Sequence, residues 1–142
     1  AAHGVQFGYH NHHVEFLEVD GQVPFDYLMQ NTDPDLVKIE LDLGWLAIAG
    51  VDAHEYLLRY QGRVIACHLK DYAPERGRAA DGSALPLQRA LVEPGGGTLD
   101  WQALLDTMAA TNVRHGFIEI DVSDDPLGAV TRGFKYLSAL RC

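Results

Sequence analysis

The chain of 142 residues has the size of one domain and is far shorter than the roughly 250 residues of a complete (β/α)₈ barrel. With 47% hydrophobic and 22% charged residues it has the composition of a globular protein, which excludes disordered, collagen-like and coiled-coil chains. Its net charge of −9 repels a phosphate backbone, so nucleic acid is not an expected partner.

The chain has no apolar run of about 18 residues and no signal-peptide pattern, so we expect no membrane partner. Its two cysteines, Cys67 and Cys142, lack the spacing of a metal site or a disulfide. Cys67 lies in an apolar run and is expected to be a small buried hydrophobic side chain. These features together predict a cytoplasmic protein.

Four short apolar runs predict β-strands. They are rich in Val, Ile, Leu and Phe, and turns with helical patterns separate them, as in parallel βαβ units. The predicted strands are Val5–Tyr9, Val37–Leu41, Val64–Leu69 and Phe117–Ile120. Capping residues and helical spacing of apolar residues predict helices over Phe25–Gln30, Ala53–Tyr60, Trp101–Ala109 and Pro126–Leu137.

The segment Asp71–Leu99 is rich in Gly, Pro, Ala and Arg. It is too long for a passive connection, and we expect a functional or a mobile loop. Its arginines, Arg76, Arg78 and Arg89, either meet an anion or form a solvated basic stretch.

The order of elements predicts an α/β fold, namely four parallel βα units that make half of a (β/α)₈ TIM barrel. No linker or repeat divides the chain, so residues 1–142 are expected to form a single domain. Four strands cannot close, and an open sheet exposes two edges and an inner face. We therefore expect a homodimer in which a two-fold axis restores eight strands.

Alternation along the strands predicts a polar side chain on the inner face at each C-terminal end. These residues are His10 with His12, Asp42, His68 and Glu119. Barrel active sites are built at that end of the strands. The deeper residues Lys38 and Glu40 are predicted to form an internal ion pair.

Inward-facing carboxylates are costly unless a counter-charge compensates them, and a divalent cation would do so. Imidazole and carboxylate ligands without thiolates suit Mn²⁺, Co²⁺, Zn²⁺ or Mg²⁺, and the mixed nitrogen and oxygen set favours Mn²⁺.

Five segments in this order resemble the xylose isomerase-like sugar isomerase/epimerase superfamily, which includes inosose dehydratases and apurinic endonucleases. They are Phe-Gly-Tyr-His-Asn-His-His-Val-Glu-Phe at 7–16, Glu-Leu-Asp-Leu-Gly-Trp at 40–45, Cys-His-Leu-Lys-Asp-Tyr at 67–72, Gly-Gly-Gly-Thr-Leu-Asp-Trp at 95–101 and Phe-Ile-Glu-Ile-Asp at 117–121. The resemblance spans essentially the whole chain, but it matches only the second half of such a barrel, units five to eight.

The resemblance implies a divalent metal held by Asp42, His68 and Glu119. The family usually supplies a further Glu from the first of these strands, where this chain has His10. The fourth ligand is therefore His10 itself, Glu15, or a substrate or water molecule. Trp45 stands beside the expected sugar, and as an aromatic wall it fits either sugar stacking or plain packing.

The implied chemistry is proton transfer next to the carbonyl of a ketose or keto-cyclitol, as in epimerisation, isomerisation or dehydration. Glu119 would move a proton on one face, and His12 is the candidate acid or base on the other. Lys70 either neutralises developing oxyanion charge or is a surface lysine at a strand end.

Two other functions stay open. The first is an inactive half-barrel or assembly module that folds as a dimer and binds metal without turnover. The second is an apurinic-site endonuclease, which the net charge disfavours.

Overall fold

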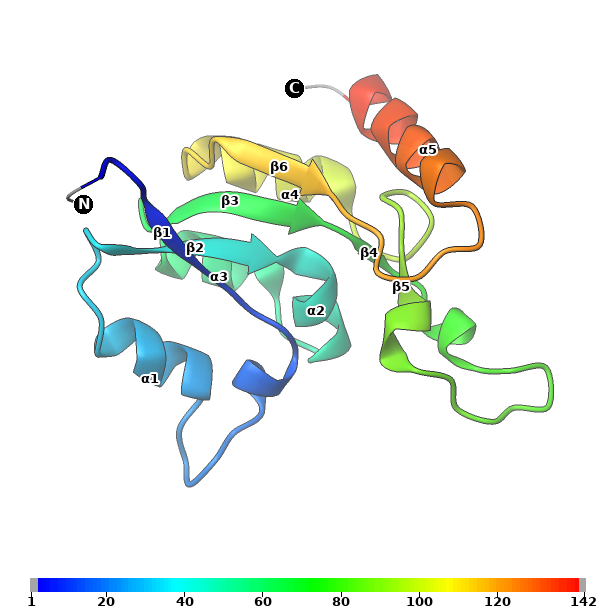
Figure 1. Ribbon diagram of the computed structural model, residues 1–142, viewed down its shortest axis with the longest axis horizontal. Helices are drawn as coiled ribbons and strands as arrows, with labels where there is room; N and C mark the ends of the chain where they lie inside the picture. Colours follow the sequence, from blue (N-terminus) through cyan, green and yellow to red (C-terminus); the bar gives the residue numbers. More distant parts are fainter. Residues whose placement is uncertain (1–2, 141–142) are drawn as a thin grey trace.

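The protein, described here by a computed structural model over residues 3–140, is built on a four-stranded parallel sheet (Figure 1). The sheet order is β1 (Phe7–His10), β2 (Val37–Asp42), β3 (Val64–Leu69) and β6 (His115–Ile118). The helices are α1 (Pro24–Gln30), α2 (Leu43–Ile48), α3 (Ala53–Arg59), α4 (Trp101–Ala110) and α5 (Pro126–Ala139), with a 3₁₀ turn η1 (Val14–Phe16). The four parallel strands and their α/β order are as predicted.

The two edge strands are displaced from their predicted positions. β1 begins at Phe7 instead of Val5, because its partner β2 begins at Val37, directly opposite Phe7. β6 runs over His115–Ile118 instead of Phe117–Ile120, because its ladder with β3 stops where Leu69 meets Ile118. Glu119 therefore lies just beyond the strand, in the segment that leads to α5.

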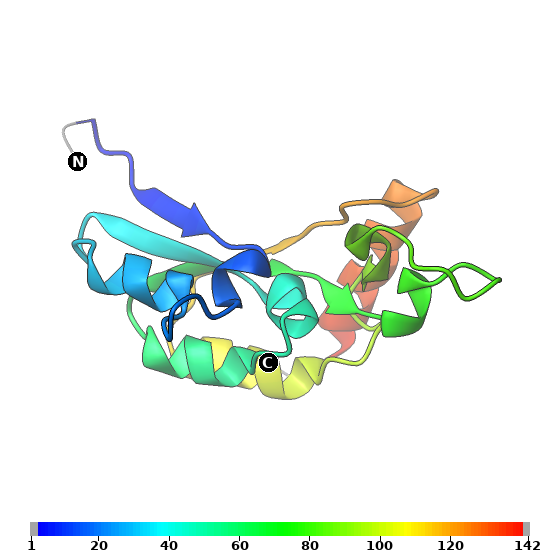
Figure 2. The ribbon, with the colours of Figure 1, turned by 90° about the horizontal axis from the view of Figure 1, so that it is seen from below.

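Helices α1, α3 and α4 cover one face of the sheet (Figure 2). The core between these layers contains Phe25 of α1, Leu57 of α3 and Leu104 of α4 against Ile39 and Cys67 of the strands. Cys67 is a fully buried free thiol, as predicted, whereas Cys142 lies outside the described residues. Burial raises the pKa of Cys67 to about 12, so the thiol is unreactive.

Helix α2 was not predicted, and it follows β2 without a connecting loop. Asp42 ends the strand and caps the helix, since its side chain accepts a hydrogen bond from Trp45 N–H. Gly44 lets α2 approach β3, because a Cβ there would lie 2.7 Å from Cβ of Lys70. The backbone of α2 is thus held against the end of β3.

The expected loop over Asp71–Leu99 is partly ordered into a second, small sheet. It contains β4 (Asp71–Tyr72) paired antiparallel with β5 (Leu91–Val92), and two 3₁₀ turns, η2 (Pro74–Gly77) and η3 (Leu87–Ala90). The buried Asp71 carboxylate accepts four hydrogen bonds of 2.8–3.0 Å, from the backbone N–H groups of Tyr72, Gly95 and Leu99 and from the indole of Trp101. It fixes the connection from the small sheet to α4.

No helix within residues 3–140 has both the length and the apolar character needed to cross a membrane.

Candidate metal and proton-transfer site

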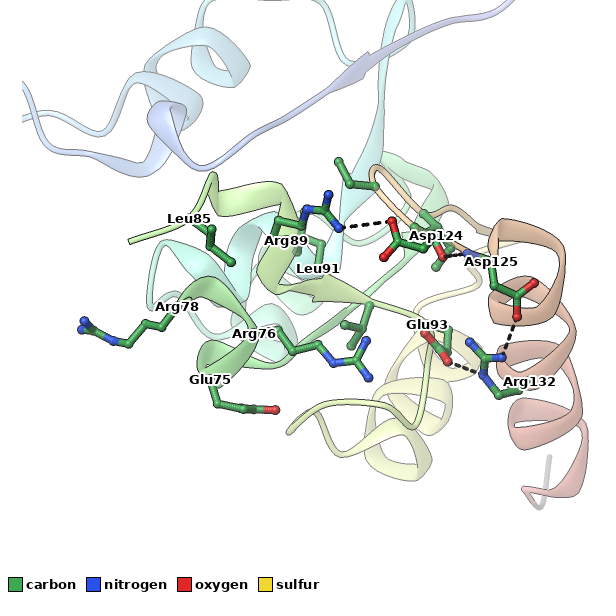
Figure 3. A pocket seen from close by; sticks show the side chains of 14 residues that line it. Glu75, Arg76, Arg78, Leu85, Arg89, Leu91, Glu93, Asp124, Asp125 and Arg132 are labelled. Atoms are coloured by element: carbon green, nitrogen blue, oxygen red, sulfur yellow. Dashed lines mark hydrogen bonds and ion pairs between the residues drawn. The ribbon is translucent and has the colours of Figure 1, made fainter. Parts of the chain in front are cut away.

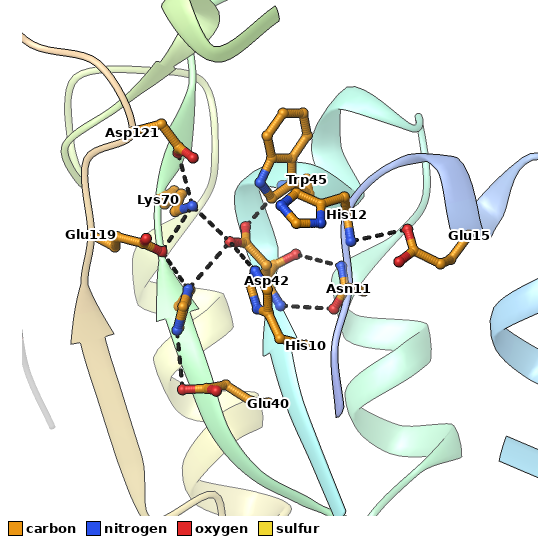
Figure 4. A network of polar contacts seen from close by, with 11 residues as sticks. His10, Asn11, His12, Glu15, Glu40, Asp42, Trp45, Lys70, Glu119 and Asp121 are labelled. Atoms are coloured by element: carbon orange, nitrogen blue, oxygen red, sulfur yellow. Dashed lines mark hydrogen bonds and ion pairs between the residues drawn. The ribbon is translucent and has the colours of Figure 1, made fainter. Parts of the chain in front are cut away.

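Polar side chains from β1, β2 and β3, and from the segments that follow β3 and β6, meet at the C-terminal ends of the strands (Figure 4). β1 contributes His10, β2 contributes Glu40 and Asp42, and β3 contributes His68. Lys70 follows β3, and Glu119 and Asp121 follow β6. The parallel arrangement places all of these ends on one side, which is where the alternation of residues predicted a site.

Asp42 is fully buried and uses its two carboxylate oxygens differently. Oδ1 accepts the Trp45 N–H at 2.9 Å and caps α2. The buried Asn11 holds the Asp42 backbone on both sides: its Oδ1 accepts from Asp42 N–H at 3.0 Å, and its Nδ2 donates to the Asp42 carbonyl at 3.4 Å. Oδ2 is left to face His68 and Lys70, so the backbone fixes the orientation of the site carboxylate.

His68 is held by Glu40 through its outer ring nitrogen. Nε2 lies 3.0 Å from Glu40 Oε1, while Nδ1 lies 3.5 Å from Asp42 Oδ2 and contacts Glu119 Oε2. A carboxylate on one ring nitrogen orients an imidazole so that the other nitrogen can bind a metal. Contacts with Asp42, Glu119 and Glu40 outweigh burial and raise the pKa of His68.

The predicted ion pair between Lys38 and Glu40 is wrong. Among the described residues Glu40 pairs with His68, and no ion pair joins it to Lys38. Lys38 lies two residues nearer the N-terminal end of β2 than Glu40. His68 of β3 is opposite Asp42, two residues beyond Glu40 in the other direction, so its imidazole is the ring that the Glu40 side chain meets. The carboxylate therefore reaches the imidazole of the neighbouring strand.

His10 completes the imidazole side of the site. Its Nε2 lies 4.0 Å from Asp42 Oδ2, and its ring lies 4.4 Å from the ring of His68. Burial and the neighbouring His68 lower the pKa of His10, despite the opposing effect of Asp42. A lowered pKa keeps this imidazole neutral, which is the form that binds metals.

Lys70 is not a surface residue, because its side chain is 1% exposed. Nζ lies 3.0 Å from Asp42 Oδ2, 2.9 Å from Glu119 Oε2 and 2.8 Å from Asp121 Oδ2. Burial alone would lower the pKa of Lys70, but the three carboxylates outweigh it and raise the pKa. Asp121 was not singled out in the sequence, although the alternation that turns Glu119 inward does the same for Asp121.

The cluster is electrostatically incomplete. Four carboxylates, of Glu40, Asp42, Glu119 and Asp121, face one lysine, which leaves a charge of −3 when the imidazoles are neutral. Within the cluster, the buried Nδ1 of His10 has no hydrogen-bond partner among the described residues, whereas Asp42 Oδ2 and Glu119 Oε2 both contact Lys70 Nζ.

Ligand atoms of His10, Asp42 and His68 lie within 4.8 Å of one another. This set of nitrogen and oxygen donors, with its excess negative charge, fits a divalent cation.

The other predicted site residues lie at the rim. Trp45 is 2% exposed; His13 stacks on it with centroids 5.1 Å apart, and His12 meets it edge-on at 5.0 Å. This burial favours the packing role over sugar stacking. Glu15 lies on the far side of His12 from Asp42 (Figure 4), where it accepts from His12 N–H at 3.0 Å and from the Tyr9 hydroxyl at 2.9 Å. Glu15 thus orders the turn that carries His12.

We predict that Lys70→Met destabilises the protein by about 3–5 kcal/mol at pH 7, because it leaves a buried carboxylate without a counter-charge. The pKa of Asp42 is lowered in the folded protein, so its ionised form contributes stability above the unfolded pKa, and this contribution is lost as the pH falls. The difference between the variant and the parent should therefore shrink as the pH falls below about 4, the unfolded pKa of an aspartate. Urea unfolding at several pH values measures it, and exposed Lys135→Met is the control. A pH-independent difference would contradict the assignment.

The chain is similar to several known proteins. No family model matches the chain. It is 29% identical over 131 residues to the inosose dehydratase of Lactiplantibacillus plantarum, covering 89% of this chain and 43% of that protein. It is 30% identical over 131 residues to the rhizopine catabolism protein MocC of Rhizobium meliloti, covering 89% of this chain and 39% of that protein.

A solved structure has the same arrangement. The sugar phosphate isomerase/epimerase of Parabacteroides distasonis superposes with a TM-score of 0.77 at 25% identity, over 97% of this chain and 48% of that one. The chain thus spans less than half the length of these three relatives, and its four βα units correspond to half of a TIM barrel.

Proposed function

We propose that this chain, a homologue of inosose dehydratases with sugar phosphate isomerases/epimerases as structural neighbours, carries a metal-dependent site for proton transfer next to the carbonyl of a ketose or keto-cyclitol. The observation that carries the proposal is that ligand atoms of His10, Asp42 and His68 lie within 4.8 Å of one another in a negatively charged cluster, where Glu119 Oε2 contacts His68 and Lys70.

Asp42, His68, Glu119 and His10 are the residues that would hold the ion. Mn²⁺ suits this donor set best, and Co²⁺, Zn²⁺ and Mg²⁺ are alternatives. A divalent ion there would polarise a carbonyl group and stabilise negative charge on its oxygen.

Three side chains would act on the substrate. Burial would raise the pKa of Glu119, but contacts with Lys70 and His68 lower it, so Glu119 is a carboxylate that can accept a proton at neutral pH. His12 lies on the opposite side of Asp42 from Glu119 (Figure 4), where it could exchange a proton at the other face of the substrate. Lys70 stays an ammonium group and would balance charge on the oxygen.

The alternative function is a half-barrel that binds metal without turnover. It remains a candidate because the chain spans less than half of its relatives, and the strands of the other half carry loops that would also contact substrate. We place either activity in the cytoplasm, in keeping with the buried free thiol of Cys67.

We predict that Asp42→Ala, His68→Ala and Glu119→Ala each weaken Mn²⁺ binding strongly, and that His10→Ala has a similar or smaller effect. His68 must lose a proton to bind the ion, and its pKa is raised, so affinity should increase as the pH rises above 6.5. Calorimetric titration with Mn²⁺, after removal of metal by EDTA, measures both effects. An absence of Mn²⁺ binding to the parent chain would refute the ligand assignment.

A further pair of variants tests whether Glu40 supports metal binding by orienting His68. Glu40→Gln removes the carboxylate that orients His68 and should weaken metal binding by about tenfold to a hundredfold. Lys38→Gln, two residues away on the same strand, should leave the affinity unchanged. Equal effects of the two variants would contradict the role of Glu40 in orienting His68.

We predict that the metal-loaded protein exchanges the proton α to the carbonyl of a ketose or keto-cyclitol with solvent deuterium, observed by NMR across a small substrate panel. His12→Asn should slow exchange by about 10²–10⁴, the range for loss of a positioned acid or base, and leave Mn²⁺ affinity largely intact. His115→Asn, at the other end of the sheet, is the control. No exchange with any substrate would favour the inactive half-barrel.

We also propose that two copies of the chain pair about a two-fold axis so that β6 of each extends the sheet at β1 of the other. Both strands are edges, and they carry exposed aromatic side chains: Phe7 is 59% exposed and Phe117 is 51% exposed.

Sedimentation should therefore find a dimer, and Phe7→Lys or Phe117→Lys should weaken it. Tyr27→Lys on α1, also exposed, should not. A folded monomer at micromolar concentration would refute this proposal.

A further inference from the structure

A cavity of about 730 Å³ has a lining that shares no residue with the cluster around Asp42 and Lys70 (Figure 3). One wall is the segment 75–93, which includes η2, η3 and β5. The other wall is the segment 120–132, which leads from β6 into α5. Ile120 lines this cavity, whereas its neighbours Glu119 and Asp121 contact Lys70. One short segment therefore separates two sites at the same end of the sheet.

Arginine side chains from both walls line this cavity. Arg76 and Arg89 come from the loop, and Arg132 comes from α5 (Figure 3). Arg78, which the sequence grouped with the first two, points away from them and donates to the carbonyl of Gly82 at 3.3 Å. The three arginines that the sequence grouped all line the cavity, and Arg132 of α5 is the fourth.

Arg76, Arg89 and Arg132 differ in how far carboxylates neutralise them. Arg132 is held by Glu93 at 2.6 Å and by Asp125 at 3.2 Å, and it ties α5 to the end of β5. Arg89 has a long ion pair of 3.6 Å with Asp124, whose side chain is 95% exposed. Within residues 3–140 the guanidinium of Arg76 has neither an ion pair nor a hydrogen bond, although it extends toward Glu93 and Arg132 (Figure 3).

We propose that this cavity binds a phosphate group through Arg76 and Arg89, while Arg132 and Glu93 keep its walls in place. A guanidinium offers paired N–H donors that match the oxygens of a phosphate. Asp124 is a weak competitor, because an exposed ion pair contributes little and its carboxylate can turn to solvent. Leu91, Val92 and Ile120 supply an apolar wall, as is usual for ligand cavities.

The neighbouring metal cluster is not an alternative place for the anion. It carries excess negative charge in the absence of metal, so it repels phosphate. A titration of EDTA-treated protein therefore tests the cavity independently of the proposed reaction.

The test is a titration of the metal-free protein with inorganic phosphate, followed by calorimetry and by NMR. We expect saturable binding at one site that weakens as salt increases. Arg76→Gln and Arg89→Gln should each lower the affinity about tenfold or more. Arg114→Gln, an arginine that lines a different cavity at the other end of the sheet, should have no effect.

Asp124→Asn is expected to strengthen phosphate binding, a result that a folding defect would not produce. It frees Arg89 from its carboxylate and should tighten phosphate binding about twofold to fivefold. Absence of saturable binding, or binding that responds to Arg114→Gln and not to Arg76→Gln and Arg89→Gln, would overturn the proposal.

A second arm identifies the source of the phosphate. If fructose 6-phosphate binds more tightly than inorganic phosphate, and Arg76→Gln removes the difference, the cavity holds the phosphate of a sugar phosphate. Equal affinities identify a site for the free anion.

Discussion

The buried ion pair between Lys70 and Asp42 is the interaction on which the rest of the site depends. Both residues are at most 1% exposed, and they come from the ends of two adjacent strands. A buried pair of this kind is favourable only when additional contacts satisfy both groups. Here Asn11 and the start of α2 hold Asp42, while Glu119 and Asp121 supply further charge to Lys70.

This requirement accounts for several local features of the chain. Gly44 allows α2 to pass close to the Lys70 backbone, where any side chain would collide. The carboxylate of Asp71, the next residue after Lys70, accepts hydrogen bonds from four donors between Tyr72 and the first residue of α4. Lys70 is therefore fixed on its N-terminal side by β3 and on its C-terminal side by the hydrogen-bonded Asp71. These contacts pre-organise charge at the strand ends, which is a general condition for electrostatic catalysis.

The segment after β6 connects this cluster with the arginine cavity. Its alternation turns Glu119 and Asp121 toward Lys70, and Ile120 and Val122 toward the cavity. Arg132, in the middle of α5, then anchors this helix to Glu93. A few residues of backbone thus connect the two sites.

The sequence by itself determined the four parallel strands, three of the helices that cover them nearly to their ends, and the inward direction of His10, Asp42, His68 and Glu119. Periods of two and of 3.6 residues encode these features locally, so they can be read without knowledge of neighbouring strands. The tertiary structure alone decided which side chains became partners. In the folded chain Glu40 pairs with His68 and not with Lys38, and Lys70 is buried among three carboxylates. His13 stacks on Trp45, and Arg78 points away from Arg76. These outcomes depend on strand register and on the path of the 71–99 segment, which are set by contacts between residues far apart in the chain.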